Sequence, residues 1–154
     1  MEKFQEHALL AKKAFQTADH LAYVTYPLLK EVKLIITIAE NLYIAAANLM
    51  DTVLEYDRLY KKIDPLVNDF EIRFDIFKNE CAKRHNINRE FVNIIVELRN
   101  IINSHKKSPM EFTKGDKFII ASQNYQIKTL TIDSIKNYVS KIRDFSAKVD
   151  SIVK

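Results

Sequence analysis

The chain has 154 residues, of which 47% are hydrophobic and 29% charged, with one glycine, one cysteine and a net charge of +4. This length predicts a single domain over residues 1–154 with a core of its own. One glycine excludes glycine-rich phosphate loops and dinucleotide fingerprints, and it disfavours an all-β fold with many tight turns. One cysteine excludes an internal disulfide and a multi-cysteine zinc site, so no metal and no cofactor is predicted.

The first two helices are predicted from apolar residues spaced three and four positions apart. This spacing places side chains on one helical face, and it runs over residues 2–24 and again over residues 28–63. The segment 25–27 separates the two helices, with Pro27 in the first turn of the second, where its missing N–H costs nothing. The second helix would be over about 50 Å long, so the spacing leaves open whether it is continuous.

Two shorter helices are predicted next. Asp64 and Pro65 have the residue types of an N-cap and a first helical position, which predicts a third helix ending near residue 84. Residues 85–87 are predicted to form a loop. Asn88 is predicted to cap a fourth helix over residues 89–104.

The pattern changes to strands after residue 108. Residues 117–121 and 125–130 are predicted to be short strands joined by a turn at residues 122–124. Thr131 is predicted to cap a final helix. The expected fold class is therefore all-α, an up-and-down bundle of about five helices with a small β-hairpin before the last helix.

The location of the protein is also suggested by its sequence. No uninterrupted apolar run approaches the ~20 residues that span a membrane, and the N-terminus lacks the layout of a signal peptide. A cytoplasmic protein without a membrane partner is therefore expected.

Positive charge is concentrated in the C-terminal third. Residues 1–98 carry 13 Lys and Arg against 15 Asp and Glu, whereas residues 99–154 carry 11 against 5. A basic region of this kind suits a polyanion such as RNA, and ordinary solvated lysines are the alternative. Lys106 and Lys107 are the candidate RNA-binding residues.

The residues most suited to chemistry lie at the end of the fourth helix. Arg99, Asn100 and His105 combine a guanidinium, an amide and an imidazole within seven positions. A guanidinium can bind a phosphate through two N–H groups, and an imidazole can move protons near neutral pH. The isolated His7, His20 and His85 have no metal-ligand spacing.

The segment from Arg99 to His105 resembles the signature of HEPN proteins (higher eukaryotes and prokaryotes nucleotide-binding). That signature is an arginine, usually followed by a polar residue, and a histidine after four to six intervening positions, late in a helix of an all-α bundle. The resemblance implies a metal-independent ribonuclease that acts at a homodimer interface, with Arg99, Asn100 and His105 as catalytic residues. It also implies a toxin or defence component, with an antitoxin or a nucleotidyltransferase-like protein as partner.

A second stripe on the fourth helix is predicted to form the homodimer interface. Val92, Val96, Arg99 and Asn103 follow one another at spacings of four, three and four, beside the core face. A two-fold contact along this stripe would bring the Arg99 and His105 side chains of two chains together. A wider core face is the alternative explanation of the two valines.

Two other functions remain open at this stage, a non-catalytic helical interaction module and an RNA-binding protein without catalysis. In either of these, Arg99 pairs with a nearby carboxylate, and His105 is a helix-terminal residue favoured by the helix dipole. Asp51, Glu55 and Asp57 lie along one helix, but without a histidine partner they predict a poor metal site.

Overall fold

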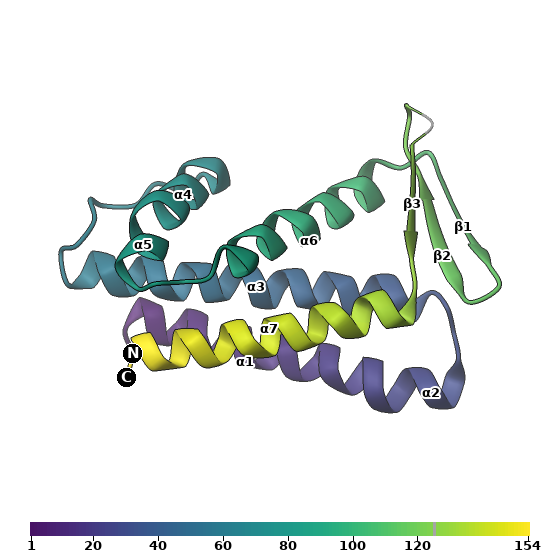
Figure 1. The fold of residues 1–154 in the computed structure, drawn as a ribbon, viewed down its shortest axis with the longest axis horizontal. Helices are drawn as coiled ribbons and strands as arrows, with labels where there is room; N and C mark the ends of the chain where they lie inside the picture. Colours follow the sequence, from purple (N-terminus) through teal and green to yellow (C-terminus); the bar gives the residue numbers. More distant parts are fainter. Residues whose placement is uncertain (125) are drawn as a thin grey trace.

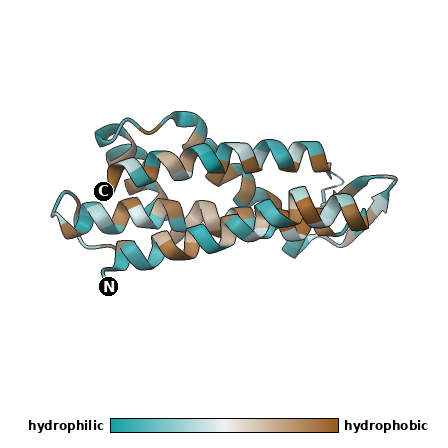
Figure 2. Cartoon of the chain, turned by 90° about the horizontal axis from the view of Figure 1, so that it is seen from below, coloured by the Kyte–Doolittle hydropathy of each residue, from teal (hydrophilic) through white to brown (hydrophobic). Residues whose placement is uncertain are grey.

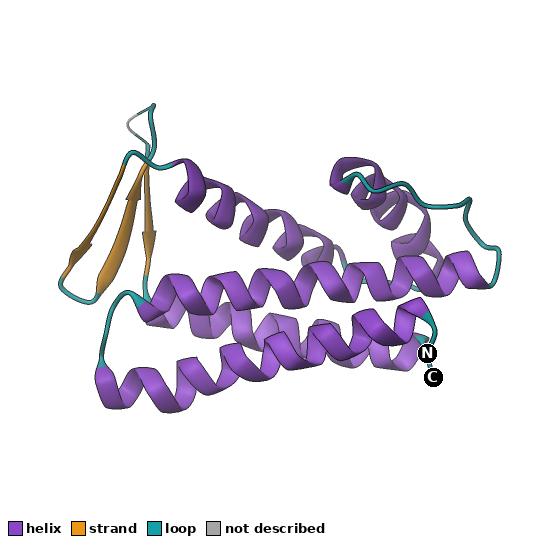
Figure 3. Cartoon of the chain, turned by 180° about the vertical axis from the view of Figure 1, so that it is seen from behind, coloured by secondary structure: helices purple, strands orange, loops and turns teal. Residues whose placement is uncertain are grey.

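The chain folds into a bundle of five helical segments with a small antiparallel sheet before the last helix, in a computed structural model that describes residues 1–124 and 126–154 (Figure 1). Three long helices, α1 (Lys3–His20), α3 (Leu34–Leu59) and α7 (Ile132–Ile152), pack side by side. The sheet stands at one end of the molecule, and both termini lie at the other (Figure 3). The predicted fold class is confirmed.

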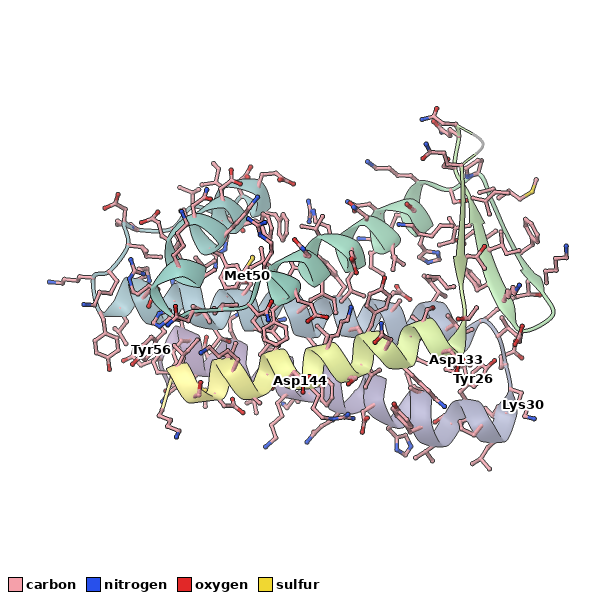
Figure 4. All side chains as sticks on the ribbon, in the orientation of Figure 1. Tyr26, Lys30, Met50, Tyr56, Asp133 and Asp144 are labelled. Carbon is pink, nitrogen blue, oxygen red and sulfur yellow. The ribbon has the colours of Figure 1, made fainter. Side chains whose placement is uncertain are left out.

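The first helical segment is longer than predicted. α1 continues through a π-helical turn, η1 (Leu21–Thr25), into α2 (Tyr26–Leu29), so the predicted break at residues 25–27 is wrong. The π turn widens the helix just before Pro27, and such local adjustments let a proline remain inside a helix. The chain turns instead at Lys30, which has a left-handed φ of 50° (Figure 4).

α3 is continuous but shorter than the predicted helix over residues 28–63. It ends in a Schellman motif, in which Lys61 adopts a left-handed φ of 57°. The N–H of Lys62 donates to the carbonyl of Asp57 at 2.8 Å, which closes the last turn. Glycine usually occupies the left-handed position, so a lysine there gives no sequence signal of the helix end.

α3 is also long and apolar enough to cross a membrane by length and composition alone. Glu40 and Asp51 interrupt its apolar run. Core helices of soluble proteins pass the same test, and half of this stretch is buried inside the fold. The buried side of α3 packs against α1, α6 and α7.

The third helical segment consists of α4 (Phe70–Ile76), the π turn η2 (Phe77–Cys81) and α5 (Ala82–Arg84). Its predicted start at Asp64 and Pro65 is wrong, because these residues lie in the loop before α4. Asp69 is the N-cap, and its Oδ1 accepts the N–H of Ile72 at 3.1 Å. The predicted end near residue 84 is confirmed.

The sheet contains one strand more than the predicted hairpin. Its order is β1 (Met110–Lys114), β2 (Lys117–Ala121) and β3 (Ile127–Leu130), all antiparallel. β1 was not predicted because it is a largely exposed edge strand with two charged residues among its five. Gly115, the only glycine, occupies the β1–β2 turn at a φ of 62°. Tyr125, the predicted first residue of the last strand, lies outside the described residues.

The last two helices begin where the sequence predicts. The Asn88 Oδ1 accepts the N–H of Glu90 at the start of α6 (Arg89–Lys107), and the Thr131 Oγ1 accepts the N–H of Ser134 at the start of α7. Apolar residues recur among polar ones along each helix (Figure 2). The apolar sides meet in one core that extends to Phe118, Ile120 and Leu130 of the sheet.

Candidate active site

α6 positions every residue that the sequence analysis selects for catalysis. Its core face is buried against α3 and α7, as the apolar spacing predicts. α6 continues through Lys107, three residues beyond the predicted end at Ser104. His105 therefore lies inside the last turn of the helix.

His105 is paired with a carboxylate of the sheet. Its Nδ1 lies 2.6 Å from the Oε2 of Glu111 on β1, and the side chains are 28% and 24% exposed. An ionised carboxylate only accepts hydrogen bonds, so Nδ1 carries the proton in this contact. The other nitrogen, Nε2, is then a proton acceptor in the neutral ring.

Arg99 is held on the opposite side, between α3 and α4. Its Nη1 donates to the Tyr43 hydroxyl at 3.0 Å, and its guanidinium carbon lies 3.8 Å from the centre of the Phe70 ring. The nearest carboxylate, Glu71, is 3.8 Å away and 75% exposed, so this ion pair contributes little to stability. Most of the five guanidinium N–H groups have no hydrogen-bond partner in the described part of the chain, and they can still bind a phosphate.

One chain does not bring Arg99 and His105 together. They are six positions apart, which at about 100° per residue turns their side chains about 120° apart. Arg99 faces α3 and α4, whereas His105 faces β1. A site that uses both groups therefore needs a second copy of the chain.

Three of the selected residues meet in a groove on a different face of α6. Asn100, Asn103 and Lys107 line a groove of about 480 Å³ between the end of α6 and the β2–β3 turn. Lys128 of β3 contributes a second cation, and amides and hydroxyls supply most of the remaining lining. The described lining contains no carboxylate. Lys106 is exposed but does not line this groove.

The predicted dimer stripe is only partly available to a partner. Val92 is 5% exposed and belongs to the core of its own chain, so its assignment to the interface is wrong. Val96 is 37% exposed, and Asn103 is half-buried at the groove. Val92 lies about 40° closer to the core face than Val96 does, which explains the difference.

Sequence reasoning missed Glu111 and Lys128. Both lie on strands, and both reach α6 only because the sheet folds back beside the end of that helix. Pro109 signals that the helix ends, but it does not indicate which residues return to it. The pairing of His105 with Glu111 therefore had no sequence signal beyond their proximity in the chain.

Three acidic residues of α3, Asp51, Glu55 and Asp57, form ion pairs. Asp57 is 1% exposed and accepts from the Arg84 Nη1 at 2.6 Å, with the His85 Nε2 at 2.8 Å. His85 is thus not isolated, contrary to the sequence expectation. Asp51 and Glu55 pair with arginines. Among the described residues, no group of three His, Cys, Asp or Glu side chains is arranged to hold a metal ion.

Cys81 lies beside the same carboxylate and is expected to be inert in the folded protein. Burial raises the pKa of the Cys81 thiol, and the hydrogen bond to Asp57 and its charge raise it further. Because the thiolate is the reactive form, alkylation by iodoacetamide should be at least about 100-fold slower in the native protein than in denaturant. Mass spectrometry of timed samples measures this, and rapid labelling of native protein would contradict the buried position.

No family model, curated protein or solved structure matches this chain significantly. The resemblance to HEPN proteins therefore rests on Arg99, Asn100 and His105 and on their place late in a bundle helix.

Proposed function

We propose that this chain is a metal-independent endoribonuclease of the HEPN type, in which His105 moves the proton during cleavage. The observation that carries this proposal is the 2.6 Å contact between the His105 Nδ1 and the Glu111 carboxylate. A carboxylate on one ring nitrogen orients the imidazole and fixes its tautomer, which leaves the other nitrogen as the proton acceptor. The ring retains enough exposure, at 28%, for an RNA 2′-hydroxyl to approach it.

The proposed reaction transfers the 3′-phosphate to the neighbouring 2′-oxygen. The His105 Nε2 takes the proton of the 2′-hydroxyl, the 2′-oxygen bonds to phosphorus, and the bond from phosphorus to the 5′-oxygen breaks. The leaving 5′-oxygen takes a proton from an imidazolium, and a second copy of His105 supplies it in a two-fold dimer. The products are a 2′,3′-cyclic phosphate and a 5′-hydroxyl.

Arg99 supplies the positive charge that this reaction needs. Negative charge builds up on the phosphate oxygens in the transition state, and a guanidinium can bind two of them at once. Tyr43 and Phe70 hold this group in place, which lowers the entropy lost when it binds phosphate. Because Arg99 faces away from His105 of its own chain, it is proposed to serve the site of the partner copy.

The test of this function is cleavage of single-stranded RNA by the purified protein in the presence of EDTA. The proposed mechanism requires fragments that end in a 2′,3′-cyclic phosphate, which mass spectrometry distinguishes from a 3′-hydroxyl. Cleavage that stops when EDTA is added, or fragments with 3′-hydroxyl ends, would contradict it.

A homodimer through α6 is the assembly that this mechanism requires. Val96→Asp should yield a folded monomer without RNase activity, because the new carboxylate would be buried at the contact. Analytical ultracentrifugation at micromolar concentrations measures the assembly, and circular dichroism checks the fold. Val24→Asp, at an exposed valine of η1, is the matched control and should remain dimeric. A monomeric wild-type protein would contradict the arrangement.

RNA binding without cleavage is the second candidate function. The groove lined by Asn100, Lys107 and Lys128 favours it, because cations can bind phosphates and amides can bind base edges. This candidate needs neither the partner copy nor a free Nε2 on His105. If the protein binds RNA tightly and leaves it intact, RNA binding without cleavage is the function that this result favours.

A further inference from the structure

A second and larger groove lies at the other end of α6. It has a volume of about 930 Å³ and is formed by η2, α5 and the first turns of α6. Its charged lining residues are Lys78, Lys83 and Arg89, and the described lining contains no carboxylate. Three amides, those of Asn79, Asn86 and Asn93, supply its remaining polar side chains.

The cations of this groove are not neutralised within the described part of the chain. None of the ion pairs there involves Lys78, Lys83 or Arg89. The neighbouring carboxylate Glu90 is turned towards α7, where its Oε1 lies 3.3 Å from the Lys141 Nζ. A concave surface with three uncompensated cations has a positive potential that attracts a polyanion.

Both grooves open on the same face of α6. Arg89 and Asn93 line the first groove, and Asn100 and Lys107 line the second. These four residues are separated by four, seven and seven positions, so at about 100° per residue they fall within about 40° of one another. The 18 steps from Arg89 to Lys107 span about 27 Å at 1.5 Å per residue.

The surface between the two grooves does not repel a strand of nucleic acid strongly. Val96, at the proposed dimer contact, lies about 20–60° to one side of these four residues, and the exposed carboxylate on their other side is Glu97. Glu97 and Tyr138 of α7 line one small cavity, and burial together with the Glu97 carboxylate raises the pKa of Tyr138. The Glu97 side chain is thus turned from the centre of the face towards α7.

We propose that the groove of Lys78, Lys83 and Arg89 binds the phosphate backbone of the same RNA strand whose other end occupies the groove of Asn100 and Lys107. This inference rests on the proposed function for the identity of the ligand. At about 3.4 Å per stacked nucleotide, the roughly 27 Å from Arg89 to Lys107 corresponds to about 8 nucleotides. The strand is single, because the amides of both grooves can bind base edges that only an unpaired strand exposes.

The test measures binding of 2′-O-methyl RNA, which cannot be cleaved through a 2′-hydroxyl, by fluorescence anisotropy. The triple variant Lys78→Gln, Lys83→Gln, Arg89→Gln should bind a strand of about 12 nucleotides at least about tenfold more weakly at low salt. The negative slope of log affinity against log salt should become less steep by about 2, since each of the three lost phosphate contacts to a single strand contributes about 0.7. A strand of about 4 nucleotides spans only about 14 Å and cannot extend from Arg89 to Lys107, so it should lose much less affinity.

A second triple variant, Lys3→Gln, Lys12→Gln, Lys13→Gln, is the matched control. It removes the same charge from exposed positions of α1 and should retain wild-type affinity and slope. Equal losses in the two triple variants would overturn the proposal, because they would show a general charge effect. Asn93→Glu places one carboxylate in the groove and should also weaken binding, which keeps the test valid if the triple variant misfolds.

Two outcomes separate this proposal from the proposed ribonuclease. If the wild-type protein binds the 12-nucleotide strand through this groove but cleaves no RNA, the proposal that the groove binds RNA is supported and the proposed ribonuclease activity is rejected. If the wild-type protein cleaves RNA but neither groove variant loses affinity, the proposal that the groove binds RNA is rejected and the proposed ribonuclease activity is supported. Double-stranded RNA that binds as tightly as the single strand would overturn the assignment of a single-stranded ligand.

Discussion

Replacing His105 with alanine should lower the rate of RNA cleavage by at least about 100-fold, because general acid–base catalysis contributes about 10²–10⁴ in rate. The loss should appear in kcat, since the imidazole acts mainly in the transition state. Asn100→Ala should have a weaker effect, because Asn100 lines the groove and does not contact His105. Gel analysis of labelled single-stranded RNA in EDTA measures all three proteins.

Two further variants make this test specific. His20→Ala removes an exposed histidine at the end of α1 and should leave the rate unchanged. Glu111→Gln keeps an acceptor oxygen near the ring but removes its charge, so it should reduce the rate by about 10- to 100-fold. Equal cleavage by wild type and His105→Ala would identify a contaminating nuclease and reject the proposed enzyme.

Replacing Asp57 with alanine should lower the free energy of unfolding by about 3 kcal/mol, because it removes the acceptor of two charge-assisted hydrogen bonds. Arg84→Ala should also be strongly destabilising, since it leaves a carboxylate that is 1% exposed with fewer partners. The double variant should be less destabilising than the sum of the two singles, because both belong to one network. Urea unfolding followed by circular dichroism measures these differences.

The chain contains a matched control for this experiment. Arg143 and Asp19 form an ion pair of similar length, 2.9 Å, but the side chains are 52% and 41% exposed. Solvent screens such a pair, so Arg143→Ala should cost less than about 1 kcal/mol. A loss as large as that of Arg84→Ala would show that burial does not set the strength of the Asp57 cluster.

The sequence by itself was sufficient for the fold class, most helices and two of their N-caps. Apolar spacing determines which side of a helix is buried, and Asn88 and Thr131 cap their own helices through local hydrogen bonds. Helix ends that depend on an unusual backbone angle were missed. Lys30 and Lys61 adopt left-handed angles without being glycine, and their residue type does not indicate this.

Only the tertiary structure decided which polar residues meet. Arg99 and His105 are neighbours in the sequence pattern, yet the rotation of α6 directs one to Tyr43 and the other to Glu111. Asp57 meets His85 across 28 positions, because the third helical segment folds back onto α3. Apolar periodicity specifies a buried face but not the partner across it, since that partner depends on how the elements rotate and pack against one another.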